Sequence, residues 1–459
     1  MPLTTHLSTS GFTASRRRVL AGLGGLSLPR FWQLRSSAVA ASSEITATAK
    51  SCIIIFTWGG MSHLETFDLK PDAPTEIRGE FSPIPTVVPG IQLGEHLPLL
   101  ARHTDKLAIV RSIHHDDSFH GRGMYWNLTG HKPPRAANIP PMRDDWPSIA
   151  AVISKFRNAP RGVPNAVRLP YPMVDNDTLQ AGEYGGWLGV KYDPIVLRPS
   201  SGLPFDGSSR TLGAEVLNLR EVDLERLAER RQLLSSLQLP TRLTGAASDY
   251  ESFQHFHSLA EDLLAGSAVK DAYNFDNERP QVREMYGNHI AGQSLLLARR
   301  LTEAGVPVVQ VCCGAGDLGG GHTWDTHGNN FNHLKNRLLP FFDRSVSALL
   351  QDLSDRGTLD ETLVVMLTDF GRTPRINANA GRDHYPDAYT IAFAGGGIKG
   401  GQVYGSTDSK AAFPKTLACS PADVHATIFQ ALGISPKAEI HDMLNRPFPI
   451  SDGQVLPLT

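Results

Sequence analysis

The 459-residue chain contains only four cysteines, and no Cys-x-x-Cys pair occurs. This scarcity argues against a disulfide framework, and the missing spacing argues against a thiolate zinc site. Cys52 and the pair Cys312-Cys313 lie within apolar runs that are typical of strands. We therefore expect these thiols to be small, buried hydrophobic side chains.

The chain also has little net charge, with a formal value of −2. Its first forty residues contain arginines but no acid, so the remainder carries about −7. A mildly acidic body without a basic stripe argues against nucleic acid as the partner. The apolar stretch Val19–Trp32 is interrupted by Pro29 and Arg30, and it is too short to predict an integral membrane span.

The N-terminus has the features of an export signal. Ser15-Arg16-Arg17-Arg18-Val19-Leu20 resembles the twin-arginine motif, a weakly apolar segment follows, and Ala38-Val39-Ala40 offers a cleavage site. We predict a signal peptide over residues 1–40 and a periplasmic or secreted protein. A disordered basic tail is the plain alternative.

The apolar content of 41% and the charged content of 20% are typical of a soluble globular protein. Apolar periodicity predicts strands and helices that alternate along the chain. The predicted strands are Ser51–Thr57, Leu107–Arg111, Val306–Val311, Thr362–Leu367 and Tyr389–Ala394, and the predicted helices are Trp146–Phe156, Gln281–Ala304, Phe331–Arg356 and Pro421–Leu432. This order predicts one α/β domain over residues 45–459, with a mostly parallel central sheet and helices on both faces.

Residues 135–280 interrupt this alternation. They are rich in Pro, Gly and Asp at first and include a charged helical stretch around Val216–Leu237. We interpret this segment as an insertion or lid.

Two groups of acids and histidines follow apolar runs. His322, Asp325 and His327 come after Val306–Val311, and the loop after Thr362–Leu367 carries the second group, Asp369, Asp383 and His384. Carboxylate and imidazole are ligands that zinc, manganese or iron accept, and the carboxyl edge of a parallel sheet brings such loops together. Asp325 and His327 could instead cap a helix that starts near Asn330.

Several ordered motifs resemble domain-of-unknown-function family 1501, whose exported bacterial members are described as sulfatase-like and placed near the alkaline phosphatase superfamily. The motifs are Gly59-Gly60-Met61-Ser62-His63-Leu64-Glu65-Thr66-Phe67-Asp68, Ser112-Ile113-His114-His115, Leu128-Thr129-Gly130, Trp324-Asp325-Thr326-His327-Gly328, Asp369-Phe370-Gly371-Arg372-Thr373-Pro374 and Gly381-Arg382-Asp383-His384. The resemblance spans nearly the whole mature chain. It implies an alkaline phosphatase-like or sulfatase-like fold.

The resemblance implies a divalent metal, zinc, manganese or calcium, with Asp325, His327, Asp369 and His384 as ligands. Two positions depart from the superfamily pattern. Trp58 stands where an aspartate is usual, which leaves His63, Glu65 or Asp68 as substitutes, and Phe370 stands where a histidine is expected. One metal site is therefore expected to survive and the second to be altered.

The resemblance also bears on the nucleophile. Counting back from Thr129-Gly130 places His120 where sulfatases carry their modified cysteine or serine, so the formylglycine route is not available. His120 is therefore a candidate catalytic residue, because a histidine can attack phosphorus or ligate metal. Ser118 is a nearby hydroxyl that a metal could activate, and Arg372 could clamp an oxyanion. For any single histidine of this region, a plain loop position is the alternative.

Two function classes follow. The first is an exported metal-dependent hydrolase of sulfate or phosphate esters, acting on small-molecule or polysaccharide-derived substrates. The second is a catalytically degenerate exported binding protein for polysaccharide or a partner enzyme.

Overall fold

The computed structural model divides the chain into residues 1–46 and residues 47–459, and the second unit contains the fold. The structure describes residues 45–135, 140–175, 178–196, 212, 214–217, 225–226, 229–230, 232–233, 247–314 and 323–459. The predicted signal peptide, His322 and most of Val216–Leu237 lie outside the described residues.

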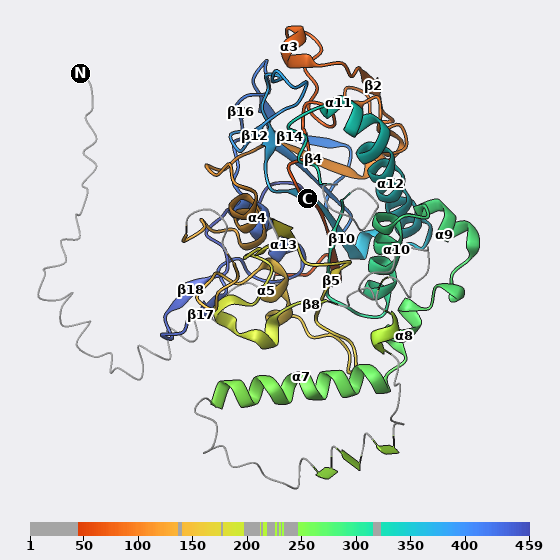
Figure 1. The fold of residues 1–459 in the computed structure, drawn as a ribbon, viewed down its shortest axis with the longest axis vertical. Coiled ribbons are helices and arrows are strands. Elements are labelled where there is room, and N and C mark those ends of the chain that lie inside the picture. The colour runs from red at the N-terminus through yellow and green to blue at the C-terminus, as the bar shows by residue number, and fades with distance from the viewer. Residues whose placement is uncertain are drawn as a thin grey trace, which may run out of the picture. The chain divides into compact units, whose positions relative to one another are not determined.

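An eight-stranded sheet lies at the centre of the second unit (Figure 1). Its strands, in spatial order, are β14 (Gln402–Tyr404), β4 (Leu107–Ile113), β13 (Tyr389–Ala394), β10 (Thr362–Thr368), β1 (Ser51–Thr57), β9 (Val308–Cys312), β5 (Ala166–Leu169) and β8 (Ile195–Val196). Only β13 runs antiparallel to its neighbours β10 and β4. The prediction of a mostly parallel sheet is confirmed.

The two innermost strands end at the same level. β1 and β10 pair in parallel from Ser51 opposite Thr362 to Thr57 opposite Thr368. Every residue of both strands is buried, which fits their β-branched and apolar sequences. The segments that follow them, beginning at Trp58 and Asp369, therefore leave the sheet side by side.

Helices cover both faces of the sheet. The described α-helices are α3 (Thr75–Arg78), α4 (His120–Thr129), α5 (Ile149–Phe156), α7 (Ala247–Ala265), α8 (Ala268–Tyr273), α9 (Pro280–Tyr286), α10 (Ile290–Glu303), α11 (Asn330–His333), α12 (Leu339–Asp355) and α13 (Pro421–Ala431). Ile53 and Ile55 of β1 pack into a core with apolar residues of α10 and α12. Ile54 and Phe56 pack on the other side with residues of α4, α5 and α13. This alternation gives one core on each face of the sheet.

Five two-stranded ribbons lie outside the central sheet. They are β2 (Pro83–Pro85) with β3 (Gln92–Gly94), β6 (Val174–Asp175) with β7 (Thr178–Leu179), β11 (Gly371–Arg372) with β12 (His384–Tyr385), β15 (Ser406–Thr407) with β16 (Pro414–Thr416), and β17 (Glu439–His441) with β18 (Pro447–Pro449), counted among the described residues. The ribbon of β11 and β12 carries Arg372 opposite His384.

Two predicted helices are interrupted. The prediction of one continuous helix over Gln281–Ala304 is wrong, because the structure has two helices, α9 and α10. Gly287, with φ 85°, lies between them. The helix predicted over Phe331–Arg356 contains a π-helical turn at Leu334–Leu338. Pro340 follows this turn and cannot donate a backbone hydrogen bond, which accounts for the local change of winding.

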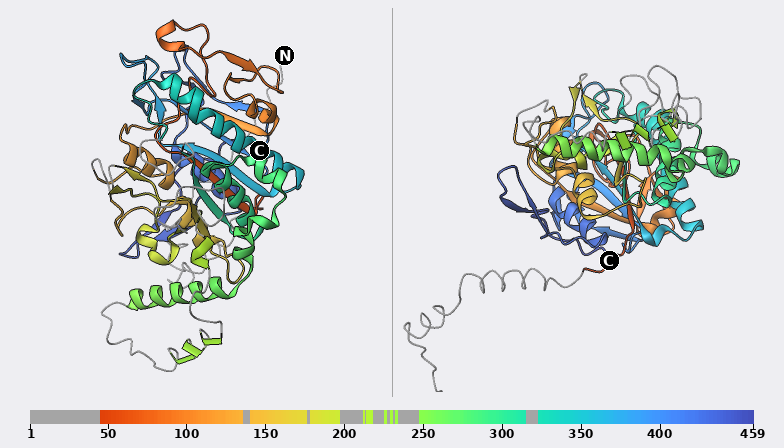
Figure 2. Two further views of the ribbon diagram at one scale, coloured as in Figure 1. Left: turned by 45° about the vertical axis from the view of Figure 1, so that its right-hand side comes forward. Right: turned by 90° about the horizontal axis from the view of Figure 1, so that it is seen from below.

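The segment of residues 135–280 supplies part of the fold itself. Strands β5 and β8 of the central sheet and helix α5 belong to it. Its helix α7 lies at the end of the unit opposite α3 in both Figure 1 and Figure 2. The role of the segment as an insertion or lid stays a prediction.

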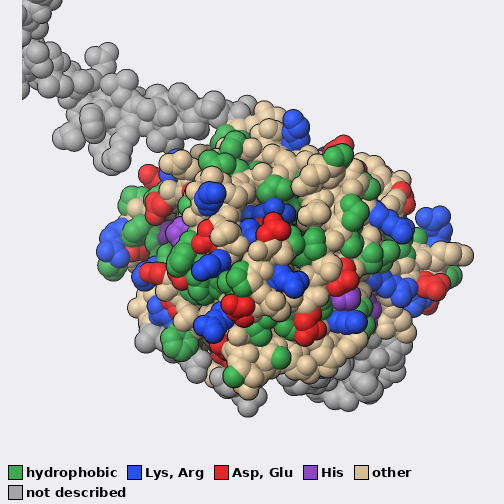
Figure 3. Space-filling model, turned by 90° about the horizontal axis from the view of Figure 1, so that it is seen from above, with side chains coloured by type: hydrophobic (Ala, Val, Ile, Leu, Met, Phe, Trp, Pro, Cys, Tyr) green, Lys and Arg blue, Asp and Glu red, His purple; other side chains and the backbone are tan. Residues whose placement is uncertain are grey.

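All four cysteines are buried and free, as expected for three of them from the sequence. On the face drawn in Figure 3, acidic and basic side chains of the described residues are interspersed. Among the described helices, none has both the length and the apolar character that crossing a membrane requires.

Candidate metal centre

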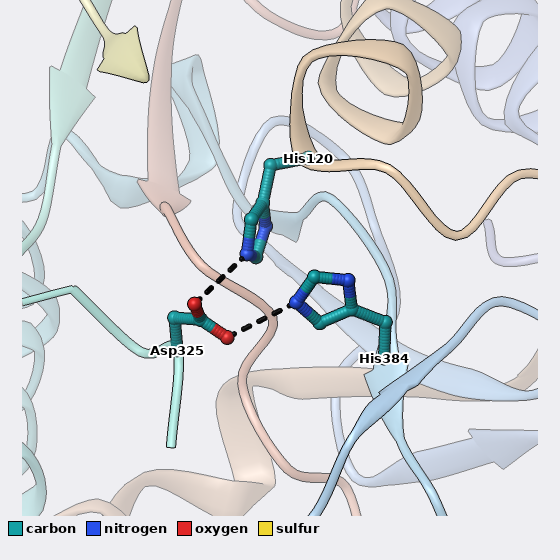
Figure 4. A group of neighbouring side chains, drawn as sticks. All are labelled: His120, Asp325 and His384. Carbon is teal, nitrogen blue, oxygen red and sulfur yellow. Dashed lines mark hydrogen bonds and ion pairs between the residues drawn. The ribbon is translucent and has the colours of Figure 1, made fainter. Parts of the chain in front are cut away.

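Three side chains from distant parts of the chain converge beyond the ends of β1 and β10 (Figure 4). His120 is the first residue of α4, Asp325 lies on the connection after β9, and His384 begins β12. One ligand atom of each lies within 4.8 Å of those of the other two. This group is a set of donors suited to one cation.

The carboxylate of Asp325 is the common partner of the histidines. Its Oδ2 lies 3.3 Å from His120 Nε2, and its Oδ1 lies 3.1 Å from His384 Nε2. A third imidazole joins them, because His327 Nε2 lies 3.2 Å from the same Oδ1. Three imidazoles therefore direct their Nε2 atoms toward one carboxylate.

The opposite ring nitrogen of each histidine already has an acceptor. His120 Nδ1 lies 2.5 Å from Asp369 Oδ2, and His327 Nδ1 lies 2.7 Å from Asp383 Oδ1. His384 Nδ1 lies 2.7 Å from the backbone oxygen of Ser118. Because these acceptors require a proton on each Nδ1, the neutral form of each ring presents an unprotonated Nε2, which is the arrangement found in metal-ligating histidines.

These Nε2 atoms need positive charge between them. His327 Nε2 and His384 Nε2 lie only 2.9 Å apart, and two unprotonated nitrogens at this distance repel each other. His120 Nε2 is buried and has no hydrogen-bond partner among the described residues. A cation held by these nitrogens and Asp325 would satisfy both features.

The charges around the cluster favour a cation. Asp369 and Asp383 each pair with an imidazole of the cluster, and Asp325 pairs with the guanidinium of Arg372. Three carboxylates are thus balanced here by one arginine. Burial raises the pKa of Asp325, but the neighbouring imidazoles of His120 and His384 and the charge of Arg372 outweigh this effect and hold the pKa of Asp325 well below its usual range. Burial lowers the pKa of His120, whereas Asp369 and Asp325 outweigh it and raise the pKa to about 9. The cluster thus attracts positive charge, whether as a proton or as a metal ion.

Asp369 is fully buried directly after β10. Its Oδ2 accepts the hydrogen bond from His120, and its Oδ1 lies 3.2 Å from both the Gly59 nitrogen and the Thr368 hydroxyl. The sequence predicts a ligand here, and the structure places its carboxylate behind His120. In this position it fixes the orientation and the proton of the ring.

Arg372 is also fully buried. Its Nη2 lies 2.6 Å from Asp325 Oδ1 and also donates to the Gly59 carbonyl. Its Nε donates to the Gly60 carbonyl and its Nη1 to the Arg382 carbonyl. The side chain predicted to clamp an oxyanion thus holds Asp325 and the turn after β1 in place.

Two further side chains support Asp369 and were not identified from the sequence as supports. His115 Nε2 donates to the Asp369 carbonyl at 2.7 Å, and Asn127 Nδ2 donates to the same oxygen at 2.9 Å. Burial lowers the pKa of His115 to about 4, so the ring is neutral. In the sequence, the motif Ser112-Ile113-His114-His115 was the only feature that pointed to a function for His115.

Trp58 and Phe370 are the residues that depart from the superfamily pattern. Both are buried, and their rings lie 5.4 and 5.0 Å from that of His120. They form apolar walls around the imidazole instead of offering ligands. A wall of this kind lowers the local dielectric and strengthens the hydrogen bond of His120 to Asp369.

The residues considered as substitutes for the missing aspartate have partners of their own. Glu65 accepts several hydrogen bonds from the buried guanidinium of Arg382. Asp68 pairs with Lys70, with 2.9 Å between Oδ1 and Nζ. The remaining substitute, His63, lies with its Nε2 3.0 Å from the Ala411 carbonyl oxygen. None of the three belongs to the group of His120, Asp325 and His384, which is the set of described residues that could hold a cation.

The cluster is open on one side. The exposed fractions of the side chains are 46% for His327, 30% for Asp325, 21% for His384 and 11% for His120. Ser118, an exposed residue, lies at this rim because its carbonyl contacts His384. Structural zinc sites are usually closed by four protein ligands, whereas catalytic sites keep a position for water or substrate. The openness here matches the second kind.

The model of the family described as "Protein of unknown function (DUF1501)" matches residues 49–458, which confirms the resemblance read from the motifs. Among curated proteins, no sequence matches the chain.

Solved structures similar to this chain include three enzymes. The PsFucS1 sulfatase from Pseudoalteromonas sp. is 8% identical, with 92% of this chain and 72% of that chain covered and a TM-score of 0.35. The phosphonate monoester hydrolase SpPMH from Silicibacter pomeroyi is 13% identical, with 90% and 76% covered and a TM-score of 0.33. The lipoteichoic acid synthase LtaP from Listeria monocytogenes is 10% identical, with 91% and 78% covered and a TM-score of 0.34.

Proposed function

The chain belongs to the family of proteins of unknown function DUF1501, and we propose that it is an exported, metal-dependent hydrolase of sulfate or phosphate esters. One observation carries the proposal. Three imidazoles, each with its Nδ1 hydrogen-bonded to an acceptor, direct Nε2 toward the partly exposed carboxylate of Asp325.

The residues that would hold the ion are His120, Asp325 and His384, with His327 beside them. Imidazole nitrogen with one carboxylate suits zinc or manganese better than calcium, which prefers oxygen ligands throughout. A divalent ion bound here would supply a Lewis acid for the oxygen of an ester.

The residues of the chain have separate tasks in this proposal. Asp369 keeps the proton of His120 on Nδ1, and Arg372 keeps Asp325 aimed at the imidazoles. Ser118 is an exposed residue whose carbonyl contacts His384, and its hydroxyl is the proposed nucleophile, with water as the alternative.

An anionic ester suits this place in the fold. Helix α4 begins at His120, so the free N–H groups of its first turn and the positive end of its dipole lie at the cluster. These groups favour a sulfate or phosphate headgroup over a neutral ester. The sulfatase-like motifs of the sequence agree with this class.

The second candidate is an exported binding protein in which the ion is structural. The apolar walls at Trp58 and Phe370 favour it, because they occupy places where the superfamily pattern expects further ligands. Such a protein would bind the ion and leave esters intact.

Metal analysis combined with ester assays separates these candidates. The full chain, purified without chelator, should contain about one divalent ion per chain and hydrolyse an aryl sulfate or an aryl phosphate. His384→Ala should lose both the ion and the turnover, whereas Asp72→Asn, at an exposed acid, should keep both. A metal-loaded wild type that leaves both ester classes intact would support the binding protein. A wild type that takes up no divalent ion would contradict both readings of the site.

A further inference from the structure

Phe119 is an exposed aromatic residue that precedes His120 of the candidate metal centre in sequence. Its exposed fraction is 57%, although it lies between two residues that contact the cluster. Ser118 on one side accepts the hydrogen bond of His384, and His120 on the other side faces Asp325. A single exposed hydrophobic side chain is common on protein surfaces, so its exposure alone indicates nothing.

The position of Phe119 makes the residue type unusual. Phe119 is the N-cap of α4, with φ −99° and ψ 134°, and it forms no side-chain capping hydrogen bond. Ser, Thr, Asp or Asn at an N-cap typically contributes about 1 kcal/mol to stability. The chain has an exposed phenyl ring here in place of a capping side chain. A function for the exposed ring would explain why phenylalanine is found at this position.

The backbone holds Phe119 in place. Its carbonyl accepts a hydrogen bond of 2.8 Å from the Gly123 nitrogen. On the following turn, Gly121 packs so closely that an added Cβ would lie 2.0 Å from Gln180 Oε1. With Ser118 fixed by His384, the ring is presented from a rigid segment. A rigid aromatic residue loses little entropy when a ligand packs on it.

We propose that Phe119 binds the organic group of the ester, and specifically packs on an aromatic or similarly apolar ring attached to the sulfate or phosphate. This inference rests on the proposed function, because the headgroup must occupy the metal centre to bring its ring to Phe119. Contacts between aromatic rings contribute about 0.5–1.5 kcal/mol beyond area burial. Phe119 thus selects esters with a ring next to the headgroup.

Two phosphonates that share one headgroup test the proposal without any turnover. Their binding to the metal-loaded full chain is measured by calorimetry, with phenylphosphonate as the ring-bearing probe and methylphosphonate as the ring-free probe. Wild type should bind phenylphosphonate about five-fold more tightly than methylphosphonate. Phe119→Ala should abolish this preference, Phe119→Tyr should keep it, and neither change should alter methylphosphonate affinity. Leu444→Ala, at a residue with 74% exposure in the turn between β17 and β18, is the control that should behave as wild type.

The outcomes separate this inference from the proposed function. If methylphosphonate binds and the preference for phenylphosphonate persists in Phe119→Ala, the role of Phe119 is excluded and the metal-dependent function stands. If wild type shows no preference while both probes bind, the inference fails in the same way. If metal-loaded wild type binds neither phosphonate, the proposed function fails and the inference fails with it.

Discussion

Asp369 Oδ2 and His120 Nδ1 lie 2.5 Å apart, and the carboxylate of this pair is fully buried. The carboxylate can only accept, so His120 must carry its proton on Nδ1 and keep Nε2 free for a cation. Gly59 donates to the other oxygen of Asp369, which prevents the carboxylate from turning away. This pair therefore determines whether His120 can act as a ligand.

Asp369→Asn should change the tautomer of His120. The new amide can still accept from Gly59 through its oxygen, but it then presents an N–H to His120 Nδ1 and moves the ring proton to Nε2. We expect metal affinity to fall about 10- to 100-fold with little loss of stability, since the side chain keeps its size. A competition titration with a chromophoric chelator measures this. Unchanged affinity would mean that His120 is not a ligand.

Asp325→Asn tests the centre of the cluster. The amide oxygen can still accept from Arg372, so the buried guanidinium is not left without a partner. Wild type should gain thermal stability on adding metal, by about 2.7 kcal/mol at a free concentration of 100 Kd. The variant should show no such gain, and Asp72→Asn should gain as wild type does. Calorimetric melting with metal and with chelator gives both values. An equal gain in Asp325→Asn would place the ion elsewhere.

The sequence predicted the central strands well, because their signal is local. The buried β-branched runs at Ser51–Thr57 and Tyr389–Ala394 coincide with β1 and β13. The antiparallel direction of β13 depends on the path of the preceding loop and leaves no mark in the strand itself. The break at Gly287 was missed because the apolar periodicity continues on both sides of it. The cap of the next helix is His289, a polar residue that the apolar pattern does not mark.

The site was predictable in its residue types and less so in its roles. Asp325 and His384 could be named because each lies in a distinctive motif, and His120 could be named by counting back from Thr129-Gly130. The structure brings these three side chains together. Which nitrogen of a ring faces which acceptor depends on side-chain orientation across segments far apart in sequence. For that reason the sequence could not show that Asp369, expected as a ligand, contacts His120, or that Arg372, expected at an oxyanion, contacts Asp325. Both expected roles stay predictions.

Gly123→Ala should disturb the contact between α4 and the end of β10. An added Cβ would lie 2.8 Å from the Asp369 carbonyl oxygen and 2.9 Å from the ring of Phe370. In an open helix, alanine would stabilise by about 1 kcal/mol relative to glycine. Here we expect a net destabilisation of about 1–3 kcal/mol and weaker metal binding, because Asp369 must shift. Urea unfolding and the chelator titration test both effects. A stabilised variant with full metal affinity would show that α4 has room at this point.

Export is tested at the two arginines of the N-terminal motif. Replacing Arg16 and Arg17 together by Lys should leave the precursor in the cytoplasm, because twin-arginine export recognises the arginine pair. Replacing Arg30 and Arg35 by Lys keeps the same charge and should leave export unchanged. Immunoblots of cytoplasmic and exported fractions give the distribution. Normal processing of the first double variant would indicate another route.

Stability should also depend on pH through Asp343, which lies on α12 and is not one of the residues of the candidate metal centre. Its carboxylate accepts hydrogen bonds from the backbone nitrogens of Leu99, at 3.0 Å, and Leu100, at 2.7 Å. Burial raises the pKa of Asp343 to about 6, and these hydrogen bonds only partly oppose the shift.

The folded state therefore binds the proton of Asp343 more tightly than the unfolded chain does. The stability that this group contributes is fully present below about pH 4 and is lost as the pH rises through about 6, with a total on the order of 3 kcal/mol. Asp343→Asn cannot titrate, so the free energy of unfolding of wild type minus that of the variant should fall over this range. Urea denaturation of both proteins in chelator at several pH values measures the difference. A difference that stays constant, or that grows as the pH rises, would show that Asp343 is ionised in the folded protein throughout this range.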